Sequence, residues 1–164
     1  MGARIEGPSV STHDKILVVD DDDTLLASMV NILESEGYLV DVARSGFEAE
    51  MKLKKGAYNL VLLDIKLPDT TGVDLLSKIN KYTPRTKKIV LTGFPDTETA
   101  IKSVNEQADA YLVKPFDPDK LIEIITENLE KQREELIYTQ EKVLEYIRNR
   151  IKELDENAIP KSRA

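Results

Sequence analysis

The sequence contains no cysteine, no tryptophan and a single histidine, His13, among its 164 residues. Without cysteine the chain has no disulfide, thiolate zinc site, iron–sulfur cluster or cysteine nucleophile. One histidine leaves almost no imidazole chemistry, and we interpret His13 as inert. Carboxylates must therefore carry most of any chemistry that this chain performs.

Long apolar runs and an excess of positive charge are also missing. The longest aliphatic runs, residues 16–19 and 60–63, are far too short to cross a bilayer. No charged-then-apolar leader opens the sequence, and Glu6 stands where a myristoylation signal needs Ser or Thr. We therefore expect a cytoplasmic protein with no membrane partner. The net charge of −7 argues against a broad basic surface, so we expect no direct nucleic-acid partner.

The length suits one domain with an appendage. Residues 1–14 are rich in Gly, Ser and Pro and have no periodicity, so we interpret them as a flexible lead-in. Regular patterns begin at Lys15 and predict a domain over residues 15–130. Residues 131–164 are predicted to form a helical extension, a probable coiled coil.

Five short aliphatic runs alternate with amphipathic stretches and predict buried strands at residues 16–19, 39–43, 60–63, 89–91 and 110–113. Typical capping residues open the helical stretches that follow these runs: Asp22 or Asp23, Ser45, Thr71, Asp96, and Asp117 before Pro118. Uniformly apolar strands with crossover helices are typical of a parallel sheet covered on both faces. We therefore predict an α/β, doubly wound, five-stranded fold whose ligands bind beyond the carboxyl ends of the strands.

The helical pattern that begins near Asp117 continues well past the predicted domain. A largely apolar stripe recurs at intervals of three or four residues, at Ile122, Ile125, Leu129, Gln132, Leu136, Gln140, Val143, Ile147, Ile151 and Leu154. The two glutamines in it weaken the stripe. This spacing is close to that of a coiled-coil seam. Because an apolar stripe is unfavourable in water, we expect a homodimer through this helix, or pairing with a partner helix.

Acidic side chains stand where two of the predicted strands end. Asp20 and Asp21 follow the first strand and Asp64 follows the third, and these ends are expected to be neighbours in a parallel sheet. Carboxylates held together need a cation, and ligands that are all oxygen favour Mg²⁺. The alternative is that such aspartates cap helices, which suits Asp22 or Asp23 better than residues that directly follow four aliphatic ones.

Two further strand ends carry complementary groups, the Thr92 hydroxyl and the Lys114 ammonium. Taken singly, each is an ordinary strand or surface residue. Together with the three acids on successive parallel strands, they predict a phosphate-sized pocket with a nucleophile, a cation and a metal.

Four segments of the sequence resemble, in order and in spacing, the receiver domain of two-component response regulators. They are the segments KILVVDDD (residues 15–22), LLDIKLPDTTG (62–72), VLTG (90–93) and AYLVKPF (110–116). The resemblance covers about residues 15–130. It implies a flavodoxin-like strand order 2-1-3-4-5, with an extended C-terminal helix here, and a cis bond between Lys114 and Pro115.

The resemblance also implies a phosphorelay role, in which Asp64 accepts a phosphoryl group from the phosphohistidine of a sensor histidine kinase. It implies Mg²⁺ as the cofactor, held by Asp20, Asp21, Asp64 and the backbone carbonyl of Lys66. The residues implied to be catalytic are Asp64, Lys114 and Thr92, and those implied to switch conformation are Thr92 and Tyr111. A receiver promotes only its own phosphorylation and dephosphorylation, so we expect no enzyme in the usual sense.

The sequence departs from the family at Leu67, where methionine is frequent. Lys66 and Phe94 flank the family's water entry route and predict an altered dephosphorylation rate. A haloacid-dehalogenase-type phosphatase would need an acid where Lys66 stands, which argues against that class. Two alternatives stay open: a receiver-like dimerisation or scaffold module that acts independently of phosphorylation, and the truncated N-terminal part of a larger regulator.

Overall fold

The computed structural model describes residues 14–93 and 107–158. The predictions for His13, Phe94 and Asp96 lie outside these residues. The strands are β1 (Lys15–Val19), β2 (Leu39–Ala43), β3 (Leu60–Asp64), β4 (Lys87–Thr92) and β5 (Ala110–Val113). The helices are α1 (Asp23–Ser35), α2 (Gly46–Lys55), α3 (Gly72–Tyr82) and α5 (Pro118–Ala158).

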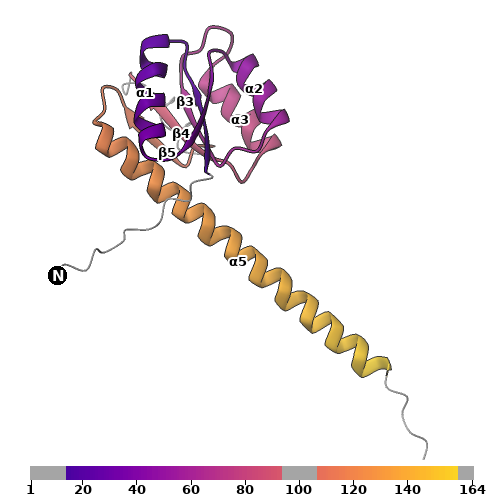
Figure 1. The fold of residues 1–164 in the computed structure, drawn as a ribbon. Helices are drawn as coiled ribbons and strands as arrows, with labels where there is room; N and C mark the ends of the chain where they lie inside the picture. The colour runs from indigo at the N-terminus through magenta and orange to yellow at the C-terminus, as the bar shows by residue number, and fades with distance from the viewer. Residues whose placement is uncertain (1–13, 94–106, 159–164) are drawn as a thin grey trace, which may run out of the picture. The chain divides into compact units, whose positions relative to one another are not determined.

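The five strands form one parallel sheet in the order β2-β1-β3-β4-β5 (Figure 1). This arrangement confirms the predicted fold class, the strand order and the extended C-terminal helix. The strand register pairs Val19 with Leu63 and Thr92 with Val113, so the strands end along one edge of the sheet. Lys114–Pro115 is a cis peptide bond, as the resemblance implied.

The sheet is covered on both faces because neighbouring residues of a strand point to opposite sides. Ile16 and Val18 pack in one cluster with α1 and the part of α5 up to Leu129, and Leu17 and Val19 pack in a second cluster with α2 and α3 (Figure 1). Residues 16–19, 60–63 and 89–91 of the central strands are therefore apolar toward both faces, which explains why they appear in the sequence as continuous aliphatic runs.

Side chains cap the described helices largely as predicted. Asp22 caps α1 and accepts hydrogen bonds from the amides of Thr24 and Leu25, at 3.0 and 3.2 Å. Ser45 caps α2 through the amide of Glu48, at 3.1 Å. Such caps satisfy amides that have no partner within the helix, and they fix where each helix starts relative to the preceding strand.

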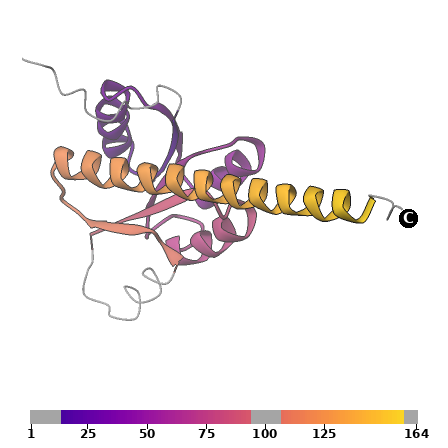
Figure 2. The same ribbon diagram turned by 90° about the horizontal axis from the view of Figure 1, so that it is seen from below.

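Helix α5 is continuous from Pro118 to Ala158 (Figure 2). The chain divides into two units, Met1–Leu129 and Glu130–Ala164. In the second unit, apolar side chains that are about half exposed recur along the helix: Ile137, Val143, Leu144, Ile147, Ile151 and Leu154. Within the described ranges, no helix has an apolar stretch of membrane-spanning length.

Candidate functional site

The structure brings three aspartates together at the carboxyl end of the sheet. One carboxylate oxygen from each of Asp20, Asp21 and Asp64 lies within 4.8 Å of the others. Asp20 directly follows β1 and Asp64 ends β3, and the pairing of Val19 with Leu63 places these two residues side by side. Asp20 is buried, Asp64 is partly buried and Asp21 is exposed, so the cluster is open to solvent on one side.

Lys114 lies across this cluster and bridges two of its acids. Its Nζ atom donates to Asp20 Oδ2 at 3.0 Å and to Asp64 Oδ2 at 3.3 Å. The contact with Asp20 is the shorter of the two. The Lys114 amide also donates to the carbonyl of Thr92 at 2.7 Å, which ties the residue to the end of β4.

The charges of this cluster are unevenly balanced, because three carboxylates face one ammonium. Burial raises the pKa of Asp64, and the nearby Asp20 charge adds to this effect, although the Lys66 amide and Lys114 oppose it. Burial alone would lower the pKa of Lys114, but its hydrogen bond to Asp20 and the charges of Asp64 and Asp20 outweigh burial and raise the pKa. The cluster therefore holds a surplus of negative charge that a bound cation would offset.

The possible ligand atoms of the acidic cluster are all oxygens. Hard divalent cations prefer oxygen ligands. The loop between β3 and α3 adds a further neighbour, Lys66, whose amide donates to Asp64 Oδ1 at 3.1 Å. This hydrogen bond holds the start of the loop against the Asp64 carboxylate. The donor set therefore fits a magnesium ion.

The two predicted switch residues lie on adjacent strands but differ in exposure. Thr92 is the last residue of β4 and is buried, whereas Tyr111 on β5 is 46% exposed. Val90 pairs with Tyr111 and Thr92 with Val113. The structure thus places Thr92 near the acidic edge, and it places Tyr111 on the surface, two residues from the end of its strand.

A largely apolar groove of about 440 Å³ lies beside Lys114, between α1 and residues 114–118. Its lining includes Leu25, Met29, Ile32 and Phe116. No pattern in the sequence indicates this groove, because its two walls are separated by about eighty residues of chain.

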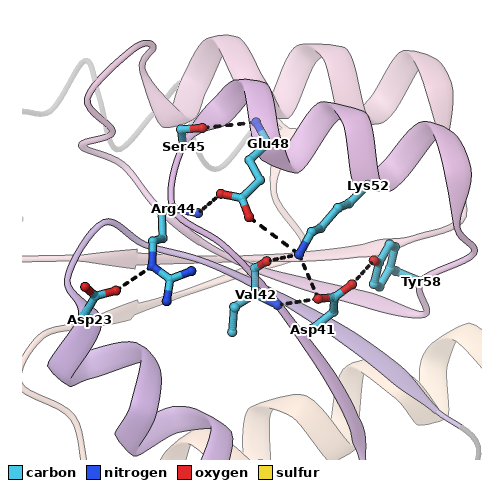
Figure 3. A network of polar contacts seen from close by, with 8 residues as sticks. All are labelled: Asp23, Asp41, Val42, Arg44, Ser45, Glu48, Lys52 and Tyr58. Atoms are coloured by element: carbon cyan, nitrogen blue, oxygen red, sulfur yellow. Dashed lines mark hydrogen bonds and ion pairs between the residues drawn. The ribbon is translucent and has the colours of Figure 1, made fainter.

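Sequence reasoning did not single out the polar contacts made by α2 and the turn before it. Arg44 pairs with Asp23 at 2.6 Å, and Lys52 pairs with Asp41 at 2.9 Å (Figure 3). Asp69, in the β3–α3 loop, accepts hydrogen bonds from the amides at the start of α2. These contacts join residues more than ten positions apart, and no local pattern of residues signals them.

Comparison with known proteins gives a consistent result for most of the chain. The sequence model of the response regulator receiver domain matches residues 16–126. The transcriptional regulatory protein ZraR of Klebsiella oxytoca is 33% identical over 118 residues, which cover 72% of this chain but 27% of that protein. The chain thus spans about a quarter of the length of this relative.

Solved structures of response regulators are also similar to this chain. The crystal structure of a response regulator receiver domain protein (CheY-like) from Methanospirillum hungatei has a TM-score of 0.71 and 45% identity, covering 74% of this chain and 98% of that one. The response regulator protein TrrA of Thermotoga maritima, solved in complex with Mg²⁺–BeF, has a TM-score of 0.65 and 36% identity, covering 70% and 98%.

Proposed function

The chain belongs to the response regulator receiver family, and from this premise we propose that it is a phosphorelay signalling receiver whose Asp64 accepts a phosphoryl group from a sensor histidine kinase. The observation that carries this proposal is the cluster of Asp20, Asp21 and Asp64, whose ligand atoms lie within 4.8 Å of one another. Lys114 contacts two of these acids, so the nucleophile, the ligand set and a cation share one edge.

In the proposed reaction, a carboxylate oxygen of Asp64 attacks the phosphorus of a phosphohistidine. A new oxygen–phosphorus bond forms while the phosphorus–nitrogen bond breaks, and its electron pair returns to the imidazole of the kinase. The product is an acyl phosphate on Asp64. Lys114 then donates to a phosphoryl oxygen, a charge-assisted hydrogen bond that stabilises the added negative charge.

Asp20, Asp21, Asp64 and the Lys66 carbonyl would hold Mg²⁺ in this proposal. When bound, the ion supplies positive charge that offsets the charge on the phosphoryl oxygens during transfer. Two observations support the assignment: the ligands are all oxygen atoms, and the cluster holds more negative than positive charge. The apolar groove beside Lys114 supports a protein as the phosphoryl donor.

Phosphorylation would act through Thr92 and Tyr111 by shifting a conformational equilibrium. The buried Thr92 hydroxyl would move toward the phosphoryl group, and Tyr111 would turn inward from the exposed position that it now has. The shift would reach the face that carries α5, because β5 directly precedes this helix in the chain.

Labelling with acetyl phosphate tests the proposal directly. The parent protein should incorporate phosphate only when Mg²⁺ is present, and chelation of the metal should abolish labelling. Asp64→Asn should remove labelling, and Asp21→Asn should weaken it by at least ten-fold. Asp74→Asn is a matched control, because Asp74 is an exposed acid in the first turn of α3. Equal labelling of the parent and Asp64→Asn would reject the proposal.

A second role concerns the helical extension over residues 131–164, which we propose forms a homodimer through its apolar stripe. The exposed apolar residues of the second unit support this role, since they recur at coiled-coil spacing. Ile147→Asp should lower the mass in sedimentation equilibrium, whereas Asn149→Asp, on another face of the helix, should not. A parent protein that dimerises while Asp64 stays inert in labelling would favour the alternative of a scaffold.

A further inference from the structure

We propose that the turn between β2 and α2, residues 43–47, is a positioning element for the metal site, and that Asp69 is the residue through which it acts. The inference rests on the proposed function, since it concerns the loop that carries the Lys66 carbonyl. The β2–α2 turn contacts both loops that bear the ligand set. It thereby fixes the distance between them before any metal binds.

The first contact joins the turn to the β3–α3 loop. Asp69 Oδ1 accepts a hydrogen bond from the amide of Gly46 at 2.8 Å, and Asp69 Oδ2 accepts one from the amide of Phe47 at 2.9 Å. Both amides belong to the first turn of α2, where amides have no partner within the helix and a negative charge is favourable. These two hydrogen bonds lower the pKa of Asp69.

The packing at the same place is tight enough to exclude a side chain. A Cβ atom added at Gly46 would overlap Cγ2 of Thr70 and would lie 3.3 Å from Asp69 Oδ1. The tip of the β3–α3 loop therefore lies directly against the start of α2. Glycine at position 46 is what allows this approach.

The second contact joins the turn to the β1–α1 loop. The Ala43 carbonyl accepts a hydrogen bond from the amide of Asp20 at 3.0 Å. The Arg44 guanidinium pairs with Asp23 at 2.6 Å, as the close view shows (Figure 3). The turn is thus attached on one side to the loop that carries Asp20 and Asp21, and on the other to the loop that carries Lys66.

In the β3–α3 loop, a movement of the tip also moves Lys66, which lies beside the acidic cluster. Its base is closed by the Gly72 amide, which donates to the Ile65 carbonyl at 2.7 Å, and by a bridge between Lys66 and Thr71. Because its two ends are joined to each other, the loop can turn as one piece about Asp64 and Gly72, so releasing Asp69 from α2 would let the loop tilt and carry Lys66 with it. The Lys66 carbonyl would then lie away from the place where the three carboxylates meet.

Two variants remove this attachment in different ways. Asp69→Asn removes the charge and one of the two accepting oxygens, whereas Gly46→Ala pushes Thr70 away and leaves every charge in place. We expect each to weaken Mg²⁺ binding by about ten-fold, which is typical when a group that orients a metal ligand is lost. Calorimetric titration with MgCl₂ measures this change. Amide hydrogen exchange of residues 65–72 in the metal-free protein should also become faster in both variants.

Two control variants separate positioning from other effects. Lys55→Ala changes an exposed side chain in the last turn of the same helix, at the opposite end from the amides that hold Asp69. Asp74→Asn removes one exposed negative charge from the same region of the surface. Both controls should bind Mg²⁺ with the parent affinity and should leave exchange of residues 65–72 unchanged.

The inference is overturned if Asp69→Asn and Gly46→Ala bind Mg²⁺ like the parent, or if Lys55→Ala weakens binding as much as they do. Equal weakening by Asp74→Asn and Asp69→Asn, with Gly46→Ala unchanged, would show that charge alone is responsible and would also overturn it. A parent protein that binds no Mg²⁺ would instead reject the proposed function itself, together with this role for Asp69. Parent binding with unaffected variants rejects the positioning role alone.

Discussion

At the scale of single residues, Lys114 is the residue on which the acidic edge depends most. Asp20 is 1% exposed, so its carboxylate is removed from water and needs a partner. Lys114 provides that partner and also contacts Asp64. In the absence of a metal it supplies the positive charge in contact with these two carboxylates, which explains why its own pKa is raised despite burial.

Replacing Lys114 by Ala should therefore destabilise the metal-free protein. We expect the free energy of unfolding to fall by about 2 kcal/mol, less than for a fully buried pair because the Lys114 side chain is 24% exposed. Urea unfolding in EDTA measures the change. Lys120→Ala, which removes an exposed pair with Glu123, is the control and should change the value by less than about 0.5 kcal/mol. An equal effect of the two variants would contradict this account of the edge.

Changing each of two glycines near the site to alanine should affect the stability of the protein differently. A Cβ at Gly72 would lie 2.7 Å from the Cα of Ile65 and 2.9 Å from the Asp64 carbonyl, and backbone atoms cannot move aside easily. A Cβ at Gly93 would meet no atom of the described residues within 4 Å. Gly72→Ala should lower the free energy of unfolding by at least about 2 kcal/mol, and Gly93→Ala should leave it nearly unchanged. Thermal unfolding of both variants checks this, and equal stabilities would refute it.

At the scale of elements, the edge strand β2 is fastened to its neighbours by a polar network around Asp41. Tyr58 donates to Asp41 Oδ2 at 2.6 Å and Lys52 donates to Asp41 Oδ1 at 2.9 Å (Figure 3). Burial alone would raise the pKa of Asp41, but these hydrogen bonds outweigh burial and lower it below its usual value of 3.8. The network thereby stabilises the ionised form in the folded protein.

This shift sets the sign of a pH dependence. Because the pKa of Asp41 is lower in the folded protein than in the unfolded chain, its stabilisation is complete above pH 3.8 and is lost as the pH falls through the folded pKa. Asp41→Asn should lower the free energy of unfolding at pH 7 by about 1 kcal/mol, a small value because the side chain is 35% exposed. Urea unfolding at pH 7 and pH 3 should show the difference between parent and variant shrinking at pH 3. A difference independent of pH would contradict the role of ionised Asp41.

At the scale of the whole molecule, α5 is the element through which the proposed phosphoryl group on Asp64 would influence the helical extension. Helix α5 is continuous from Pro118 to Ala158, so the residues that pack in the core and those of the exposed stripe belong to one element. A conformational change at the start of this helix could therefore be passed to the extension through the backbone and hydrogen bonds of the helix itself. We expect phosphorylation to alter pairing of the extension.

Solution mass with and without beryllofluoride, a mimic of the phosphoryl group, tests this coupling. Sedimentation equilibrium of the parent with Mg²⁺ should show at least a several-fold change in the dimerisation constant when the mimic is added. Asp64→Asn, which should not bind the mimic, provides the control and should show no change. Equal dimerisation of the parent in both conditions would refute the coupling while leaving phosphoryl transfer to Asp64 intact.

The sequence by itself determined the strands, the main helix caps and the acids at strand ends. These features are local: buried strands need unbroken aliphatic runs such as 60–63, and a cap such as Ser45 acts on an amide three residues away. The strand order came from the resemblance, and the roles of Asp64, Thr92 and Lys114 stay predictions that labelling will test.

The tertiary structure alone decided which distant groups meet. Lys114 contacts Asp20 across 94 residues of chain, and Asp69 reaches the amide of Gly46 across 23. No periodicity or cap signals such pairs, because they depend on how separate loops pack at one edge of the sheet. Residue patterns report the backbone conformation of a segment, whereas contacts between loops follow from the packing of helices on both faces of the sheet.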